Sequence, residues 1–329
     1  MMVDFNRGKE ILYGKFRGSE VKTAVLYENE VYMLKYPDPI REKRNVLSYM
    51  NNQFSEHIGS SIFRACGFDA QETVLGYFNA PNGKEKVVVG CKDLTQHGGT
   101  LIEFSIFENQ AMIEGKRGTS IESVYEVVSK SNLIQNKQEI LDKFWDMFVV
   151  DTLIGNPDRH FDNWGLLEKD GEMTFAPIYD CGSALSALVS DEKMETLLSE
   201  PTEMKRIEYN ITSVYYSGGK RIFCHEIFNN PPEDLKEAIK RIVPKIDMAK
   251  ICGIIDSTPV MPEIRKAYLK EALNLRYMQI LAPALKRTRA ASPKRDSLLS
   301  RLEGAKEEAR EINAKSTPAR RKGKNEQEH

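Results

Sequence analysis

The sequence predicts an α+β fold of two lobes, a β-rich N-lobe followed by an α-helical C-lobe. Up to about residue 98, runs of β-branched and aromatic residues alternate with polar turns, as in antiparallel strands. From about residue 101, apolar residues recur at three- and four-residue steps, as in helices. The 329 residues are enough for one bilobed core with an appendage. We therefore expect an N-lobe (1–98), a C-lobe (99–285) and a tail (286–329).

The N-lobe contains three segments with a clear pattern. Residues 24–35 predict a hairpin around the polar turn at Glu28, and residues 72–78 and 86–94 predict two strands around a Pro-Asn-Gly turn. Between them, residues 45–66 carry apolar side chains on one face, which predicts a helix.

In the C-lobe the same spacing predicts a series of helices, over residues 121–129, 138–154, 191–198, 233–243, 246–255 and 262–285. The serine-rich stretch 182–224 could cover the mouth of a cleft and present a protein substrate. The alternative, from composition alone, is that much of it is loop and helix with surface hydroxyls. After Lys286 the composition becomes rich in Ser, Lys, Arg and Glu, which predicts disorder with a weak amphipathic helix over 298–312.

One motif carries the chemistry. The helix 138–154 ends at Gly155, and the loop behind it contains Asp158-Arg-His-x-x-Asn163. Two short strands, 164–167 and 174–179, follow with a Lys-Asp-Gly turn between them, which would bring Asp180 back over Asn163. Acid, amide and acid are therefore expected to converge.

These three residue types are what phosphoryl transfer needs. An acid must lie beside the attacking hydroxyl, and an amide with a second carboxylate must hold the Mg²⁺ that neutralises charge between the β- and γ-phosphates of ATP. Asp158 is the candidate base, and Asn163 and Asp180 are the candidate metal ligands. The alternative is that Asp158 caps a turn, Asn163 is a left-handed loop residue and Asp180 ends a strand. Such roles do not require all three residues together.

Two further residues fit a kinase site. Lys35 ends a predicted strand, where its amine could reach the α- and β-phosphates, and Glu56 on the following helix could fix that lysine by an ion pair. The alternatives are a solvent-facing lysine at a strand edge and an ordinary solvated helix charge. His160 could contact phosphate or brace the loop, or be a neutral core histidine, and Arg159 is expected to position the loop by ion pairing.

Two segments are expected to hold the rest of the nucleotide. The turn Phe16-Arg-Gly-Ser contains Gly18, which permits close approach of amides to phosphate, and Ser19 and Lys22 could add contacts. It is not a G-x-G-x-x-G loop, and a plain turn is the alternative. The strand end from Val89 to Asp93 would offer peptide groups to the adenine edge and a carboxylate to the ribose. Its alternative is a buried central strand leaving the sheet. The candidate nucleotide-binding residues of this strand end are Val89, Cys91, Lys92 and Asp93.

Charge and composition restrict the partners, the cellular location and the cysteine chemistry that we expect for this chain. The formal net charge is −1, but the chain from Lys286 onward has 13 Lys and Arg against 7 Asp and Glu. The tail could touch nucleic acid or an acidic partner, although a solvated tail is the simpler interpretation. No apolar run is long enough to cross a bilayer and no signal peptide is visible, so we expect a cytoplasmic protein. The five scattered cysteines indicate neither a disulfide framework nor a zinc site.

Taken together, the sequence resembles the HipA-type serine/threonine kinases, and most of all their compact stand-alone bacterial members. The resemblance covers roughly residues 10–285. It is carried by the loop motif, Tyr179-Asp180-Cys-Gly, the strand that ends in Lys35, the Gly18-Ser19-x-x-Lys22 turn and the strand 87–93. It implies a bilobed kinase-like fold, shared distantly with phosphatidylinositol kinases.

By position, the resemblance implies that Asp158 is the catalytic base and that Lys35 is the phosphate lysine. It also implies that Asn163 and Asp180 are the magnesium ligands, that Gly18 to Lys22 form the phosphate loop, that residues 89–92 are the adenine hinge, and that a loop serine such as Ser19 is autophosphorylated. Tyr179, next to Asp180, and His160 are also expected at the nucleotide site. The long HipA toxins have an additional N-terminal subdomain for which this chain has no room, so antitoxin binding is not carried over. The expected reaction is transfer of the γ-phosphate of ATP to a protein hydroxyl. A lipid or small-molecule kinase and a non-catalytic binding module are the alternatives.

Overall fold

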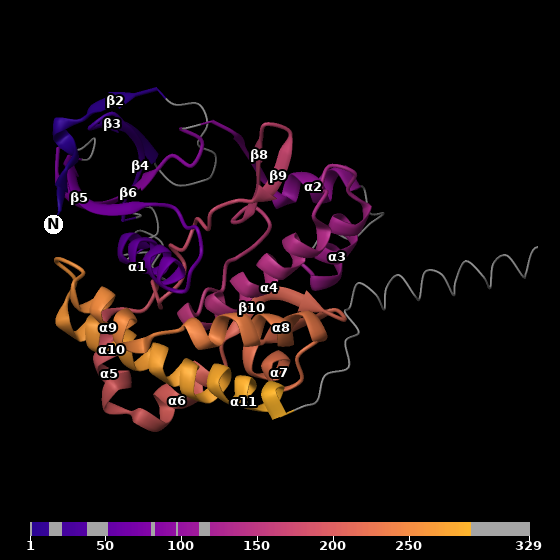
Figure 1. Cartoon of the computed structure of the whole chain (residues 1–329). Helices are drawn as coiled ribbons and strands as arrows, with labels where there is room; N and C mark the ends of the chain where they lie inside the picture. Colours follow the sequence, from indigo (N-terminus) through magenta and orange to yellow (C-terminus); the bar gives the residue numbers. More distant parts are fainter. Residues whose placement is uncertain are drawn as a thin grey trace, which may run out of the picture.

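The chain is described by a computed structural model that covers residues 2–12, 22–37, 52–79, 83–96, 98–111 and 119–290. A curled sheet with one helix beneath it forms the N-lobe, and the helices of the C-lobe lie below (Figure 1). The predicted order of a β-rich lobe before an α-rich lobe is therefore confirmed.

The N-lobe sheet has six strands in the order β1-β5-β6-β4-β3-β2. Their bounds are β1 Val3–Asp4, β2 Lys9–Ile11, β3 Lys22–Tyr27, β4 Glu30–Lys35, β5 Thr73–Asn79 and β6 Glu85–Lys92. The predicted hairpin is confirmed as β3 and β4, which pair antiparallel in continuous register. The central strand β6 is paired on both sides, with β4 and with β5.

Phe5 explains why this sheet contains glycines in its strands. The short 3₁₀ helix η1 (Phe5–Arg7) places the Phe5 ring, which is fully buried, on one face of the sheet. A Cβ atom at Gly76 would lie 2.6 Å from that ring, and a Cβ atom at Gly90 would lie 2.4 Å from it. Both strands therefore need glycine here because a larger residue would displace the ring.

Helix α1 (Asn52–Ala65) connects the N-lobe to the C-lobe. It packs against β5 and β6 of the sheet and against α9 (Met248–Asp256) of the C-lobe. Only part of the predicted helix 45–66 can be compared, because residues 45–51 lie outside the described residues.

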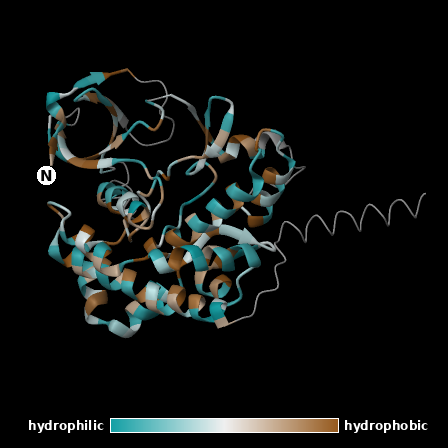
Figure 2. Cartoon of the chain, viewed as in Figure 1, coloured by the Kyte–Doolittle hydropathy of each residue, from teal (hydrophilic) through white to brown (hydrophobic). Residues whose placement is uncertain are grey.

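The C-lobe is built around α4 (Lys137–Ile154), whose residues are almost all buried from Phe144 to Ile154. This explains why its apolar residues are not confined to one face. The surrounding helices are α2 Phe104–Ala111, α3 Ile121–Lys130, α5 Asp191–Ser199, α6 Pro201–Tyr209, α7 Cys224–Asn229, α8 Glu233–Ile242, η3 Val243–Lys245, α9 Met248–Asp256, α10 Glu263–Arg276, η4 Tyr277–Leu281 and α11 Ala282–Ala290. These outer helices carry alternating hydrophilic and hydrophobic segments, as expected when one face is buried (Figure 2).

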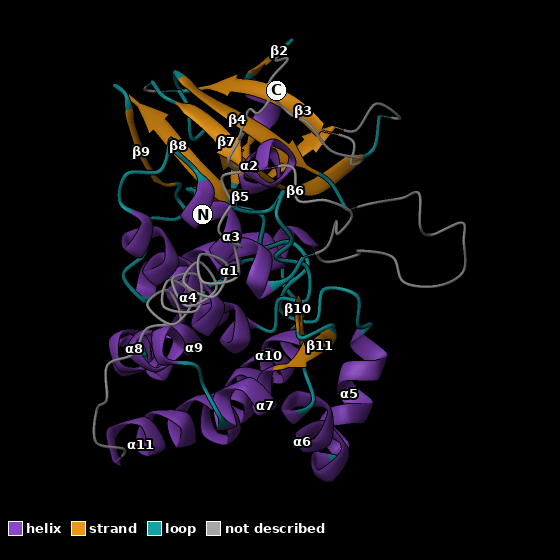
Figure 3. Cartoon of the chain, turned by 90° about the vertical axis from the view of Figure 1, so that its right-hand side faces the viewer, coloured by secondary structure: helices purple, strands orange, loops and turns teal. Residues whose placement is uncertain are grey.

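Five strands of the C-lobe form two small sheets (Figure 3). The first has the order β7-β8-β9, with β7 Thr100–Glu103, β8 Gly165–Lys169 and β9 Glu172–Phe175. The second is a hairpin of β10 (Thr212–Ser217) and β11 (Lys220–Phe223). Loop and helix were predicted for much of the stretch 182–224, and α5 and α6 confirm this. The hairpin itself was not predicted; Gly218 and Gly219, both at positive φ, form a tight turn between its two short strands.

The predicted helix 262–285 is divided and longer than expected. It consists of α10, the π-helical segment η4 and α11, and it ends at Ala290 rather than before Lys286. The remainder of the predicted tail, with the helix expected over 298–312, lies outside the described residues. Among the residues that are described, no helix has both the length and the apolar character needed to cross a membrane.

Candidate active site

Lys35 joins the two lobes. It is the last residue of β4, and its side chain is almost completely buried. Its Nζ atom is 2.7 Å from Glu56 Oε2 on α1 and 2.9 Å from Asp180 Oδ1 in the C-lobe. Burial alone would lower the pKa of Lys35, but the charges of Asp180 and Glu56 outweigh it and raise the pKa well above its usual value. The lysine is therefore a fixed cation at neutral pH.

Glu56 also holds the segment that carries Asp180. While Oε2 accepts from Lys35, Oε1 accepts a hydrogen bond of 3.0 Å from the backbone N–H of Cys181. Close packing supports this contact, since a Cβ atom at Gly59 would lie 2.6 Å from that of Cys181. The helix and the segment can approach so closely only because residue 59 is glycine.

Asp158 lies in the loop that follows α4. That helix ends at Gly155, whose left-handed φ of 62° turns the chain into the loop. The N–H of Asp158 donates to Asn156 Oδ1 at 3.1 Å, and Oδ2 of Asp158 accepts from the Ser183 hydroxyl at 3.1 Å. The Asp158 side chain is 42% exposed, so it is accessible from outside the protein.

The next residue, Arg159, is buried and binds the surrounding segments together. Its guanidinium donates to both carboxylate oxygens of Asp151 on α4, at 2.9 and 3.0 Å. It also donates to the carbonyls of Asn163, Tyr179 and Asp180. Burial disfavours the charge, but Asp151 outweighs this and raises the pKa of Arg159 well above its usual value. One buried cation thus brings the Asn163 and Asp180 backbones together.

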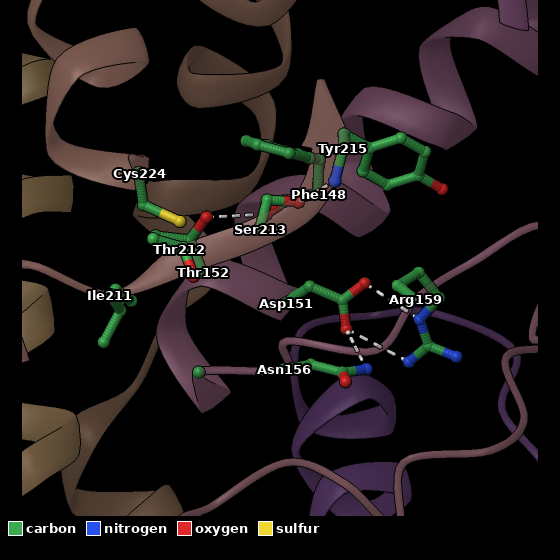
Figure 4. A pocket seen from close by; sticks show the side chains of 11 residues that line it. Phe148, Asp151, Thr152, Asn156, Arg159, Ile211, Thr212, Ser213, Tyr215 and Cys224 are labelled. Carbon is green, nitrogen blue, oxygen red and sulfur yellow. Dashed lines mark hydrogen bonds and ion pairs between the residues drawn. The ribbon is translucent and has the colours of Figure 1, made fainter. Parts of the chain in front are cut away.

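Figure 4 shows the Asp151–Arg159 pair at the edge of a small cavity. Asn156 donates to the same aspartate from its side-chain amide at 3.1 Å. The cavity is about 10 Å³, just enough for one water molecule, and is lined by Phe148, Asp151, Thr152, Gly155, Asn156, Arg159, Ile211, Thr212, Ser213, Tyr215 and Cys224. It is too small for a nucleotide, so this part of the loop is a support.

The remaining loop residues surround the candidate metal ligands. The Asn163 side-chain nitrogen donates to the Asp158 backbone carbonyl at 2.8 Å, which leaves the side-chain oxygen Oδ1 of Asn163 as the ligand-type atom. The Tyr179 hydroxyl donates to the Asp162 carbonyl at 3.2 Å. His160 is partly exposed, with Nδ1 3.4 Å from Asp162 Oδ2 and Nε2 3.9 Å from Asp158 Oδ1. It is therefore not a core histidine.

The expected hinge lies within the sheet rather than beyond it. Val89 and Cys91 are fully buried in β6, and Lys92 forms an ion pair of 2.9 Å with Glu30. The N–H of Lys92 donates to Glu72, and that of Asp93 donates to Val31, both at 2.9 Å. The Asp93 carboxylate accepts from Thr95. These groups therefore have sheet or turn partners within the protein, and the adenine-hinge role of residues 89–93 stays a prediction.

The expected phosphate turn cannot be compared in the same way. Gly18 and Ser19 lie outside the described residues, and of Lys22 only the backbone is described, as the first residue of β3 paired with Lys35. The flanking strands β2 and β3 are antiparallel neighbours in the sheet.

Two supporting features of the site were not predicted. Asp151 is an acid inside the apolar run of α4, and that pattern could have indicated a buried ion pair. The second is the pair of Glu208 and Arg276, both almost fully buried, at 2.7 Å. Arg276 also donates to the Leu153 carbonyl at 3.1 Å. Its partner is 68 residues away in the sequence, so no local signal could have found it.

Comparisons with known proteins agree with this geometry. The family described as the HipA-like C-terminal domain matches residues 15–249, more than half of the chain. The serine/threonine-protein kinase CtkA of Helicobacter pylori is 37% identical over 269 residues, which cover 79% of this chain and 80% of that protein.

Two solved structures are also similar. The crystal structure of the H. pylori proinflammatory kinase CtkA matches with a TM-score of 0.82 and 34% identity, covering 90% of this chain and all of that one. HipA of Shewanella oneidensis MR-1, in a structure with HipB and operator DNA, matches with a TM-score of 0.51 over 86% of this chain and 69% of that one. At 12% identity the latter shows the fold alone. The chain belongs to the HipA-like C-terminal domain family and is a kinase of the HipA type.

Proposed function

We propose that this kinase transfers the γ-phosphate of ATP, bound with Mg²⁺, to a serine or threonine hydroxyl of a protein. The observation that carries the proposal is the position of Lys35, held at 2.7 Å from Glu56 and 2.9 Å from Asp180. A strand lysine paired with a helix glutamate, next to the metal-binding aspartate, is the arrangement that kinases use to hold nucleotide phosphates.

The donor set suits magnesium. The side-chain oxygen Oδ1 of Asn163 and the Asp180 carboxylate are hard oxygen donors, and Mg²⁺ is commonly held by one or two such groups together with phosphate oxygens. When bound, the ion would neutralise charge that develops on the phosphates during transfer. The ammonium of Lys35 would contact the α- and β-phosphates from the N-lobe side.

Asp158 would orient the acceptor hydroxyl and accept its proton. Its carboxylate is partly exposed, as an acceptor from a second molecule requires. Arg159 would keep the loop in register with the Asp180 segment, because it bonds to backbone carbonyls on both. The naming of the H. pylori relative as a serine/threonine-protein kinase supports a protein acceptor.

The test is labelling with ATP that carries a tagged γ-phosphate. Generic protein substrates and phosphoinositide vesicles are offered in parallel to the wild-type chain and to the Asp180→Ala variant. The proposal predicts label on protein, lost in the variant. Label on lipid alone would replace it with a lipid kinase, and no label on either would overturn it.

We also propose that Ser19 in the phosphate turn is an inhibitory autophosphorylation site. The support is the resemblance of the Gly18-Ser19 turn to the phosphate loop of HipA-type kinases. Peptide mapping by mass spectrometry after incubation with ATP should find phosphate on Ser19, and activity should fall as it accumulates. Modification at other positions only would contradict this assignment.

A further inference from the structure

Ser183 lies against the candidate base. Its Oγ atom is 3.1 Å from Asp158 Oδ2. Since a carboxylate can only accept hydrogen bonds, the serine hydroxyl is the donor. The two residues are 25 positions apart, so the contact depends on the fold that brings the two segments together.

The segment that presents Ser183 is held on both sides. Before it, the Cys181 N–H is bound to Glu56 at 3.0 Å. After it, the Leu185 N–H donates to the carbonyl of Ile154, the last residue of α4, at 2.9 Å. The Ala184 N–H closes a turn onto the Cys181 carbonyl at 3.0 Å. The hydroxyl is therefore fixed relative to the helix that precedes the catalytic loop.

The two oxygens of Asp158 have different surroundings. Oδ2 accepts from Ser183, whereas Oδ1 is 3.9 Å from His160 Nε2, which is beyond hydrogen-bond distance. The carboxylate is partly exposed. One oxygen is thus restrained by the protein, whereas the other has no hydrogen-bond partner among the residues that the structure describes.

We propose that Ser183 is a positioning residue for phosphoryl transfer, which holds Oδ2 of Asp158 so that Oδ1 faces the acceptor hydroxyl. The proposal rests on the kinase function above and adds a residue to it. Ser183 acts through Asp158, and its hydroxyl keeps its own proton throughout the reaction. Without this donor the carboxylate can rotate, and small misplacements of a catalytic group are costly.

The experiment compares Ser183→Ala with Ser183→Thr and with a control from the same segment, Ser186→Ala. The Ser186 hydroxyl is bonded to Tyr268 instead of the base. We expect Ser183→Ala to lower kcat by about tenfold with little change in KM for ATP, since the hydroxyl affects orientation rather than nucleotide binding. Ser183→Thr, which keeps the hydroxyl, should recover most of kcat, and Ser186→Ala should retain wild-type kcat.

Two further measurements distinguish a positioning role of Ser183 from a purely structural role. Thermal unfolding of each variant reports loss of fold, and a fall in kcat that merely follows a fall in Tm overturns the proposal. In an Asp158→Asn background, loss of the Ser183 hydroxyl should have much less effect, because residues that act as a unit are not additive.

Other outcomes would also overturn the proposal. These are equal kcat for Ser183→Ala and Ser186→Ala, a change confined to KM, and phosphate found on Ser183 itself, which would make it an acceptor. If the wild-type chain transfers no phosphate, the proposed kinase function itself is wrong. If it does, and Ser183→Ala has wild-type kcat, only the role of Ser183 is wrong.

Discussion

Asp158 and Arg159 are neighbours in the candidate catalytic loop, but their surroundings differ sharply. We call the side with Asp158 the reactive side and the side with Arg159 the supporting side. Among the described residues, one hydroxyl holds the Asp158 carboxylate, and this side chain is 42% exposed. The Arg159 side chain is 1% exposed and is hydrogen-bonded to an aspartate and three carbonyls. The reactive side thus has few contacts and the supporting side has many. This teaches that chemistry and stability should be separable here by single substitutions.

The largest expected effect is on the reactive side. Asp158→Asn keeps the shape of the side chain but removes the proposed base, so kcat should fall by about 10²–10⁴-fold. Stability should change little, because the residue is exposed and weakly held. The matched control is Asp170→Asn in the exposed turn after β8, which should leave kcat unchanged. Steady-state kinetics and urea unfolding of both variants check the prediction, and equal kcat values would contradict it.

The opposite result is expected on the supporting side. Arg159→Met leaves Asp151 as a buried charge without its ion-pair partner, and the free energy of unfolding should fall by about 3–5 kcal/mol. A control is Arg206→Met on α6, which breaks a bidentate contact with Glu203 where both side chains are exposed, the arginine to 65%. That loss should be much smaller, because exposed ion pairs contribute little to stability. If urea unfolding shows the two variants losing equal stability, the contrast between the two sides is wrong.

A smaller loss of stability is expected from substitutions of two glycines at positive φ. One of them is crowded by Arg276 behind the loop, and the other has open space around it. Gly155→Ala places a Cβ atom 2.6 Å from the Arg276 guanidinium at a positive φ. Gly171→Ala introduces the same kind of φ in a turn with no atom within 4 Å of the new carbon. Gly171→Ala should cost about 1 kcal/mol, and Gly155→Ala should cost more and also reduce kcat. Equal costs in denaturant unfolding would show that Arg276 does not support the loop.

The smallest effect concerns pH. Burial lowers the pKa of His57, which lies beside Glu56 on α1, with its Nδ1 3.1 Å from Thr73 Oγ1. Since the unfolded chain then binds a proton more readily, stability should begin to fall as the pH drops below the unfolded value of about 6.5. His57→Gln should weaken that fall between pH 7 and 5.5 in urea unfolding. An unchanged pH dependence in the variant would contradict a buried neutral histidine.

Most residues of the reactive side could be predicted from the sequence, whereas few residues of the supporting side could. The chemistry of phosphoryl transfer restricts which residues can surround the phosphates, so the spacing of Asp158, Asn163 and Asp180 was informative. Lys35 and Glu56, which the structure brings together, followed from the order of strand and helix. Their catalytic roles stay predictions.

The supporting side depends on contacts between distant segments. Glu208 meets Arg276 only after α6 and α10 have packed, and Ser183 reaches Asp158 only once α1 and α4 hold its segment. Two short strands were not predicted for another reason. The strands β10 and β11 have six and four residues, too few for their alternation to be distinguished from a serine-rich loop. The adenine-hinge role expected for residues 89–93 stays a prediction.

The central claim is that Asn163 and Asp180 hold a divalent ion together with the phosphates of ATP beside Lys35. Isothermal titration calorimetry of the whole chain with ATP, with and without Mg²⁺, tests it most directly, with Asp180→Ala and the control Asp170→Asn alongside. The account predicts tight binding only with the metal, lost in Asp180→Ala and kept in Asp170→Asn. Binding that does not depend on Mg²⁺, or that survives in Asp180→Ala, would contradict it.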